Sequence, residues 1–328
     1  MIIEPEKTNF QVKLLGSSAL IHLPSLFTVI EAVSFKETFQ QTCQQHTGLE
    51  QIVIDFNQTN FIDSSGIGVL VMSRKAAQNC GIELILRNIS AEVMLTFALT
   101  DLDTLFTIEP KPEPVAPTKA QKPCVTHPSV RSRTKRLIDI LGALVGLSIT
   151  VVLLMPIAIA IKWEDSGPIF FSQTRCSWMG RRFKIWKVRS MVVNAERLKH
   201  TINNRMQGPL SKDPDDPRIT KVGRFIRRTS LDELPQFWNV LKGDMSLVGT
   251  RPPTPDELEK YDVPQWQRLD VKPGMTGEWQ VNGRSSVTSF DDVIQLDLKY
   301  QRKWSLMYDI KLICKTILVI FNKDAGAV

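Results

Sequence analysis

The sequence predicts two folded parts: an α/β domain over residues 1–110 and an α+β domain over residues 131–328 that carries a membrane-inserted helix at about residues 137–161. Three observations support this division. The first hundred residues alternate strand-like and helix-like runs, residues 111–130 are rich in proline, and a long apolar run follows them. With 328 residues, 43% of them hydrophobic, the chain is long enough for two cores.

The first part has the pattern of a small α/β domain. Three runs read as strands, ALIHL, QIVIDF and IELILRN, because β-branched and other apolar residues dominate them. Two longer runs, SFKETFQQTCQQ and SGIGVLVMSRKAAQNC, read as helices between the strands. Alternating strands and helices predict a sheet covered by helices.

A proline-rich stretch, EPKPEPVAPTKAQKPCVTHP, follows this domain. Proline lacks the backbone N–H that helices and sheets need, so the stretch is predicted to be an extended linker at residues 111–130.

The charge is uneven. Residues 1–117 hold 7 basic and 13 acidic residues, and the remainder holds 34 basic and 21 acidic residues. A basic domain usually meets phosphates, in nucleic acid, in nucleotides or on an anionic membrane surface. Charge alone does not choose among these.

The cysteines and the amino terminus indicate a reducing, cytosol-facing location. The five cysteines are odd in number and never in a CxxC spacing, which argues against a disulfide framework and against a zinc site. The first residues, MIIEPEKTNF, lack the basic and apolar regions of a signal peptide, so export of residues 1–117 is not expected.

The apolar run LIDILGALVGLSITVVLLMPIAIAIK has about the length that spans a bilayer. A simple transmembrane helix is one interpretation. However, basic residues flank both ends, and such flanks prefer the cytoplasmic side. Pro156 can kink the helix, so we expect a re-entrant helix that returns to the face it entered. The last apolar stretch, DIKLICKTILVIFNK, suits either an interfacial helix or a core helix.

The densest polar region covers residues 213–257. Ser230 can cap a helix that places Asp232 and Glu233 in its first turn, where the helix dipole favours carboxylates and phosphates alike. An isolated acidic pair at a helix start is usually structural. Here many arginines and lysines surround the pair, which favours an anionic ligand held with a divalent ion such as Mg²⁺.

Several long motifs in the second part then match a known family. They are KRLID, SGPIFFSQTRCSWMGRRFKIWKVRSM, DPRITKVGRFIRRTSLDELPQFWNVLKGDMSLVG, KPGMTGEWQVNGRSS and LDLKYQRKWSLMYDIKL. From Thr134 to about Asn322 the chain resembles the bacterial sugar transferases, the monotopic polyprenyl-phosphate phosphoglycosyl transferases. The resemblance implies a re-entrant helix that carries a catalytic domain on the cytoplasmic face of the bacterial plasma membrane.

The resemblance also implies the reaction. A sugar 1-phosphate would pass from a nucleoside-diphosphate sugar, with uridine as the expected base, to a polyprenyl phosphate such as undecaprenyl phosphate, with Mg²⁺ as cofactor. This step would initiate exopolysaccharide or another lipid-linked glycan. Asp232 matches the nucleophile that forms an aspartyl-phosphosugar intermediate, Glu233 matches a magnesium ligand, and Asp309 in YDIKL matches a further active-site acid.

Further residues match positions associated with phosphate or nucleotide binding. Arg227, Arg251 and Arg284 are the main candidates, and Lys187 and Arg189 are weaker ones. One departure is Thr250, where many members have proline before Arg-Pro. The reading GTRPP occurs in members related to glucose or galactose phosphate transferases, so activity stays credible.

The first part resembles the anti-sigma-factor antagonist (STAS) domains through IVIDFNQTNFIDSSGIGVLVMSRK, residues 52–75, and loosely over residues 10–108. The resemblance implies that a partner kinase phosphorylates Ser64, and the added charge would change partner docking. The alternative is that Asp63 and Ser64 only cap the following helix.

Other functions are weaker. A membrane-tethered binding protein with an inactive transferase would be favoured by loss of the Asp-Glu pair, which is present. A STAS-bearing anion transporter needs many membrane spans, and nucleic-acid binding would need a recognisable motif. The expected partners are therefore a UDP-sugar, polyprenyl phosphate and the membrane, without nucleic acid. A kinase or regulatory protein at the STAS domain and a second copy of the chain are partners that the sequence leaves open.

Overall fold

The structure is a computed structural model that describes residues 10–46, 48–100, 102–109, 126–195, 197, 216–282 and 289–321. It has two compact units, each described here by itself. The first contains residues 1–126 together with two short segments from further along the chain, Trp178–Arg181 and Tyr261–Asp270. The second contains His127–Ser177, Arg182–Lys260 and Val271–Val328. Most of the predicted linker, residues 111–130, lies outside the described residues.

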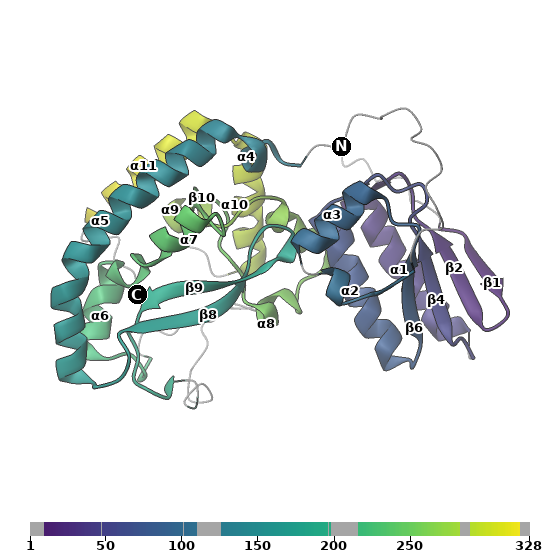
Figure 1. The fold of residues 1–328 in the computed structure, drawn as a ribbon, viewed down its shortest axis with the longest axis horizontal. Coiled ribbons are helices and arrows are strands. Elements are labelled where there is room, and N and C mark those ends of the chain that lie inside the picture. The colour runs from purple at the N-terminus through teal and green to yellow at the C-terminus, as the bar shows by residue number, and fades with distance from the viewer. Residues whose placement is uncertain are drawn as a thin grey trace. The chain divides into compact units, whose positions relative to one another are not determined.

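The first unit is built on a five-stranded sheet with the order β1-β2-β4-β6-β7 (Figure 1). The strands are β1 Val12–Leu15, β2 Ser18–His22, β4 Gln51–Asp55, β6 Glu83–Arg87 and β7 Thr107–Ile108. β1 and β2 form an antiparallel hairpin, whereas β2, β4, β6 and β7 run parallel. Parallel neighbours need crossover connections, and the helices between the strands supply them. The predicted α/β class of this part is confirmed.

Three α-helices connect these strands: α1 Val29–Gln45, α2 Ser64–Asn79 and α3 Ala91–Leu99. A 3-10 turn, η1 Leu102–Thr104, precedes β7, and β3 Leu26–Phe27 pairs with β5 Phe61–Ile62. Phe27, Phe35 and Phe39 are buried, and the rings of Phe27 and Phe35 pack edge to face with centroids 5.4 Å apart. This aromatic cluster gives the unit its own core, because each buried aromatic side chain removes a large apolar area from water.

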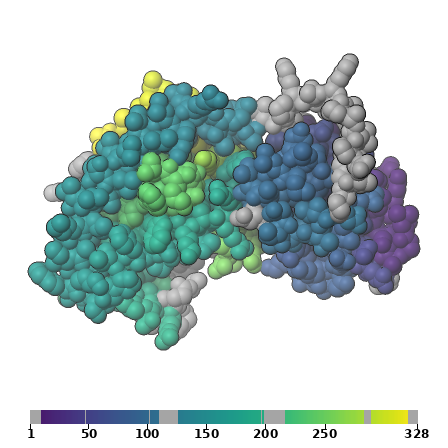
Figure 2. Space-filling view, viewed as in Figure 1, coloured from purple at the N-terminus to yellow at the C-terminus, as the bar shows by residue number. Residues whose placement is uncertain are grey.

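A 32-residue helix, α5 Arg133–Glu164, follows the short α4 Pro128–Arg131 in the second unit. One face of α5 is buried along its whole length, at Lys135, Asp139, Ala143, Gly146, Thr150, Ile157 and Ile161. The other face is apolar and exposed, as in Val151, Val152 and Met155, which are 71 to 73% exposed. By length and composition α5 could cross a membrane. The teal part of the chain, which includes α5 and the residues that follow it, makes up much of the visible surface of this unit (Figure 2).

The helix continues through Pro156 without a break and is visibly curved (Figure 1). Proline cannot donate to the carbonyl of residue 152, so the ladder of helical hydrogen bonds loses one member there. The predicted re-entrant path through a membrane stays a prediction.

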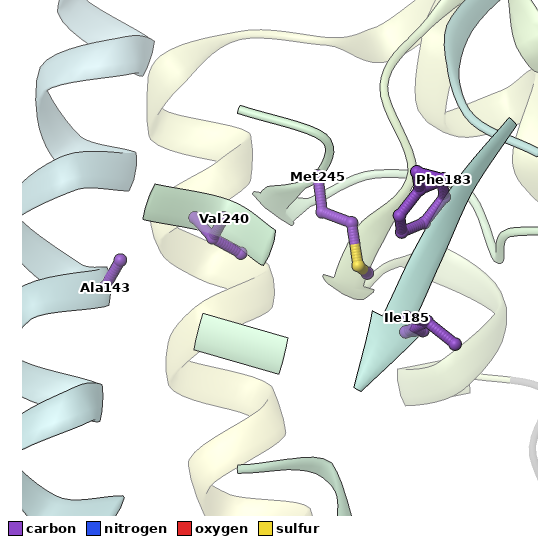
Figure 3. Packing of buried hydrophobic residues seen from close by; sticks show 5 residues of the cluster. All are labelled: Ala143, Phe183, Ile185, Val240 and Met245. Atoms are coloured by element: carbon purple, nitrogen blue, oxygen red, sulfur yellow. The ribbon is translucent and has the colours of Figure 1, made fainter. Parts of the chain in front are cut away.

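The buried face of α5 packs on a core formed by a hairpin and a short helix. The hairpin strands are β8 Phe170–Cys176 and β9 Arg182–Val188, and the helix is α7 Gln236–Lys242. Ala143 of α5 lies beside Val240 of α7, with Met245, Phe183 and Ile185 beyond it (Figure 3). α6 Lys221–Arg228 and the 3-10 turn η4 Leu231–Glu233 precede α7.

The carboxyl-terminal elements complete the second unit. β10 Ser246–Val248 pairs in parallel with β11 Gly274–Thr276, and α8 Pro255–Leu258 lies between them in sequence. Three helices end the unit: α9 Glu278–Asn282, α10 Phe290–Lys303 and α11 Leu306–Phe321. Leu312 of α11 is buried, whereas Met307 and Leu318 are 72% and 69% exposed. α11 therefore combines the two predicted characters: one face packs in the core, and the other is exposed and apolar. The remaining 3-10 segments, η2 Trp178–Gly180 and η5 Val263–Asp270, belong to the first unit.

Candidate active site

The Asp232-Glu233 pair lies in a 3-10 turn and not in the first turn of an α-helix, so the helix start predicted at Ser230 was wrong in its detail. Ser230 has a left-handed backbone, φ 57° and ψ 20°, and its side chain caps nothing. The α-helix begins only at Gln236. Pro235 explains the break, because it has no N–H to donate to the carbonyl of Leu231. The turn leaves the two carboxylates on a tight bend before α7.

Asp232 is buried and faces a lysine from the neighbouring hairpin. Lys187 Nζ of β9 lies 3.9 Å from Asp232 Oδ2 and 3.2 Å from Glu233 Oε1. Burial raises the pKa of Asp232, because a buried carboxylate loses its hydration, and the charge of Lys187 opposes that rise. Glu233 is more exposed, with 35% of its side chain accessible. The two adjacent carboxylates therefore have different environments.

Arg227 is the second cation of this site. Its Nε donates to Ser190 Oγ over 3.1 Å, which fixes the arginine beside the end of β9. The charge of Arg227 also lowers the pKa of Asp232, so its guanidinium acts electrostatically on that carboxylate. The predicted residues Lys187, Arg227, Asp232 and Glu233 thus share one site.

Arg251 is held by a carboxylate that the sequence did not single out. Its Nη1 and Nη2 lie 2.9 and 3.2 Å from the two carboxylate oxygens of Glu257, a bidentate pair. Arg175 lies 3.9 Å from the same carboxylate and feels the charges of both Arg251 and Glu233. Through Arg175, the Arg251-Glu257 pair joins the electrostatic environment of the acidic turn.

Two sequence signals could have indicated these missed residues. Thr254 and Glu257 form a capping box at the start of α8, which the spacing Thr-Pro-Asp-Glu encodes. Arg175 stands in SQTRC, inside a motif that matched the family. Burial lowers the pKa of Arg175 to about 10, with the nearby charge of Arg251 acting in the same direction.

Arg189 lies close in sequence to Lys187 but has different partners. Its Nη1 lies 3.0 Å from Asp165 Oδ2, and its Nη2 donates to the Asp165 carbonyl over 2.8 Å. These bonds tie the end of β9 to the end of α5. Its phosphate-binding role stays a prediction.

Asp309 lies in a buried network of its own. Its carboxylate accepts from Lys135 Nζ over 2.6 Å, from the Tyr300 hydroxyl over 2.8 Å and from Trp304 Nε1 over 3.2 Å. Lys135 also donates to the Val248 carbonyl over 3.0 Å. The network joins α5, α10, α11 and β10. Among the residues that the structure describes, no hydrogen bond or ion pair links Asp309 directly to Asp232, and the catalytic role of Asp309 stays a prediction.

Arg284 and Ser64 are the other two predicted site positions. Arg284 lies outside the described residues. Ser64 is the first residue of α2 in the first unit and is fully buried, and Asp63 caps that helix by accepting from the Gly66 amide over 2.8 Å. The predicted capping role of Asp63 is confirmed.

The residues present fit a magnesium ion only in part. Within the described residues, no group of three or more His, Cys, Asp or Glu side chains could hold a metal ion. The adjacent carboxylates of Asp232 and Glu233 are two oxygen donors, and Mg²⁺ commonly takes one or two protein carboxylates with substrate phosphates and waters. Substrate phosphates would have to supply further ligands.

Two known families match the chain, one over each part. Residues 130–323 match the family described as Bacterial sugar transferase, and residues 9–114 match the STAS domain. A galactosyl transferase of Streptococcus agalactiae is 52% identical over 188 residues, covering 57% of this chain and 42% of the relative. An undecaprenyl-phosphate galactose phosphotransferase of Salmonella typhimurium is 44% identical over 200 residues, covering 58% and 41%. The chain thus spans about two fifths of the length of these curated relatives.

Solved structures are also similar to part of this chain. The Bacillus cell fate determinant SpoIIAA in its phosphorylated form is 18% identical and has a TM-score of 0.27, covering 31% of this chain and 92% of that one. The assignment of residues 9–114 rests on the family match.

Proposed function

Because the chain belongs to the bacterial sugar transferase family and carries an amino-terminal STAS domain, we propose that it is a phosphoglycosyl transferase. It transfers a sugar 1-phosphate from a UDP-sugar to a polyprenyl phosphate, in the class of undecaprenyl phosphate. Two relatives are named for such donors or acceptors: a UDP-galactose-lipid carrier transferase of Erwinia amylovora and the phosphotransferase of Salmonella typhimurium. The product would start an exopolysaccharide or another lipid-linked glycan.

The observation that carries this proposal is the environment of Asp232. A buried carboxylate with a lysine 3.9 Å away and an arginine acting on it is suited to meet an electrophilic phosphorus. Burial removes competing water, and the cations offset the negative charge that a phosphoryl group brings.

The proposed reaction has two displacements at the same phosphorus. Asp232 Oδ attacks the phosphorus that bears the sugar, a P–O bond forms to the carboxylate, and the bond to the second phosphate breaks, so that UMP leaves. An oxygen of the lipid phosphate then attacks the aspartyl phosphosugar. The bond to Asp232 breaks, the carboxylate is regenerated, and a polyprenyl diphosphosugar is released. Covalent catalysis of this kind lets a soluble donor and a membrane acceptor use one site in turn.

The surrounding residues would orient the phosphates. Lys187 and Arg227 would contact the phosphate that Asp232 attacks. Arg251 would bind the other donor phosphate and would give up part of its pairing with Glu257 to do so. Glu233, the more exposed carboxylate, would hold Mg²⁺, which when bound offsets charge on the donor phosphates. Arg284 remains a further candidate residue for binding the phosphates or the nucleotide of the donor.

The exposed apolar face of α5 supports attachment to a membrane. Its residues from Leu137 to Trp163 would otherwise leave an extended apolar strip in water. We propose that this face enters the cytoplasmic leaflet of the bacterial plasma membrane as a re-entrant helix. The polyprenyl phosphate would then reach Asp232 from the lipid.

Purified full-length protein in detergent provides the test. It is incubated with UDP-glucose, UDP-galactose and other UDP-sugars, with undecaprenyl phosphate and with Mg²⁺ or EDTA, and UMP release is measured. We expect UMP release with at least one donor and its loss in EDTA. Without lipid, intact mass spectrometry should detect one added phosphosugar per chain.

Asp232→Asn should abolish both UMP release and the added mass. Asp256→Asn is the matched control, because Asp256 is an exposed first-turn acid of α8, and this variant should behave as the parent protein. If Asp232→Asn released UMP at the parental rate, or if no donor gave UMP in the parent, the proposed function would be wrong.

A further inference from the structure

The amino end of α2 in the first unit is covered by a segment that belongs, in sequence, to the transferase half. This segment, Tyr261–Asp270, is counted with the first unit although it lies within the residues that match the sugar transferase family. Its side chains at Val263, Trp266 and Leu269 are buried, with 1 to 4% exposed. The segment is therefore a folded part of the first unit and not a surface loop.

Two anchors hold the segment on α2, and the first is a set of polar contacts at Ser64. The Asp270 carboxylate accepts from the Ser64 amide over 3.0 Å, and its Oδ1 lies 2.6 Å from the Ser64 hydroxyl. The same hydroxyl lies 2.7 Å from the carbonyl oxygen of Trp266. A carboxylate at the first amide of a helix is also favoured by the helix dipole.

The second anchor is steric. The indole of Trp266 lies against Gly68, so close that a Cβ atom added there would be 2.4 Å from the ring. Only glycine leaves room for the ring at this helix position. Lys36 Nζ of α1 also lies 3.1 Å from Asp262 Oδ1. This ion pair is exposed to solvent, so it contributes little to the stability of the docked segment.

The chain on either side of the segment leads to the two supports of Arg251. On the amino-terminal side lies α8, whose Glu257 binds the Arg251 guanidinium. On the carboxyl-terminal side, Val271 enters a core with Val248 and β11 follows. There the Gly249 amide donates to the Thr276 carbonyl and the Gly274 amide to the Thr250 carbonyl, each over 2.9 Å. Thr250 directly precedes Arg251.

We propose that the amino end of α2 is a docking site whose ligand is the chain's own segment Tyr261–Asp270, and that the STAS domain supports transfer by holding this segment. While the segment is docked, both supports of Arg251 are fixed. Release of the segment loosens them and weakens donor binding. Docking and a negative charge on Ser64 exclude each other, because the charge would face the Asp270 carboxylate at hydrogen-bond distance. Phosphorylation of Ser64, or an acidic residue at position 64, therefore lowers the transferase activity.

The test uses hydrogen–deuterium exchange of the full-length protein in detergent. In Gly68→Ala the new methyl group expels Trp266, so exchange at the amides of Trp266–Asp270 should rise at least tenfold. Ser64→Asp should have the same effect through charge. Exchange in β4, Gln51–Asp55, and in α7 should stay at the parental level, which separates undocking from unfolding. Gln78→Ala, an exposed change on the same helix, is the control and should alter nothing.

Gly68→Ala has a clear opposite outcome. Alanine is a better helix former than glycine, so if no indole is docked there, amide exchange in the variant would be as slow as in the parent, or slower. If the amides of Trp266–Asp270 exchanged at the parental rate in both Gly68→Ala and Ser64→Asp, the proposed docking site would be wrong.

The second part of the proposal, that docking of the segment supports sugar-phosphate transfer, rests on the proposed function. It is tested separately, by the kinetics of UMP release. Both variants should lower kcat/KM for the UDP-sugar at least fivefold, mainly through KM. Faster exchange with unchanged kcat/KM would overturn the control of transfer and leave the docking site standing. If the parent protein released no UMP, the proposed function would fail, and exchange alone would still decide docking.

Discussion

At the scale of single residues, Lys187 decides how readily Asp232 can act. Burial raises the pKa of Asp232, and the Lys187 charge holds that rise in check. Only the deprotonated carboxylate can attack phosphorus. Lys187→Met should therefore raise the pKa of Asp232 further and move the acid limb of the kcat/KM profile to higher pH, by about one pH unit if the pair contributes roughly 1.4 kcal/mol. Activity should fall most on the acid side of the profile, where the variant keeps Asp232 protonated.

The pH profile of UMP release checks this prediction. Lys187→Arg keeps the positive charge and should keep the parental limb, even if its activity is lower. Lys184→Met is the matched control, because Lys184 is exposed on the same strand. An unshifted limb in Lys187→Met would mean that Lys187 binds substrate without tuning Asp232.

The sequence predicted the cluster of Asp232, Glu233, Lys187 and Arg227 but not the partners of the other candidates. The cluster could be predicted because an acidic pair among many cations is unusual at a helix start, and because the family motifs cover it. The partners of Arg189 and Asp309 come from elements that are remote in sequence, Asp165 and Lys135 among them. Such pairs depend on tertiary packing, which a single sequence does not encode locally.

At the scale of elements, α5 is the helix whose environment matters most for function. Its buried face packs on the rest of the second unit near both ends, at Lys135 and at Ile161, so both ends of the helix stay close to that unit. A helix crossing the bilayer would separate its ends by the membrane thickness. We therefore expect the residues that flank α5, Arg131 and Ser166, to lie on the cytoplasmic side.

Cysteine labelling measures this topology. Arg131→Cys and Ser166→Cys, both at exposed positions, are introduced singly into a background without other cysteines. An impermeant maleimide should label both in inside-out vesicles and neither in right-side-out vesicles. Restoring only Cys80, an exposed cysteine of the first unit, gives the reference for the cytoplasmic side. Labelling of the two positions from opposite sides would show a spanning helix.

Element predictions succeeded where a periodic pattern was long. The strands β4 and β6 lie within the runs that the sequence indicated, and the helices α1 and α2 overlap their runs but begin before them, at Val29 and Ser64. The start of α7 was missed because Pro235 splits the run into a 3-10 turn and a helix. The sequence did not predict that η5 belongs to the first unit. Its buried side chains pack on α2, which lies about 200 residues earlier in the chain, and such a contact leaves no local pattern.

At the scale of the whole molecule, the stability of the first unit should depend on pH through Asp63. Burial and the nearby Asp270 charge raise the pKa of Asp63 to about 7, against an ordinary value of 3.8. The folded unit thus holds this proton more tightly than the unfolded chain does. The resulting stabilisation is full below about pH 4 and is lost as pH rises toward 7, and it amounts to at most about 4 kcal/mol. The pKa of Asp270 is also raised, which acts in the same direction.

Asp63→Asn separates this contribution from other titrations. Asparagine stays neutral and still caps a helix through its side-chain oxygen, so it imitates the protonated acid. The measurement is the opening free energy of the β4 amides from hydrogen exchange between pH 4.5 and 7.5, corrected for intrinsic exchange. In the parent this free energy should fall with rising pH by more than in Asp63→Asn, whereas α7 in the second unit should respond equally in both proteins. Equal slopes at β4 would mean that Asp63 is already ionised at pH 4.5 in the folded chain, and that the segment Tyr261–Asp270 docks against two negative charges.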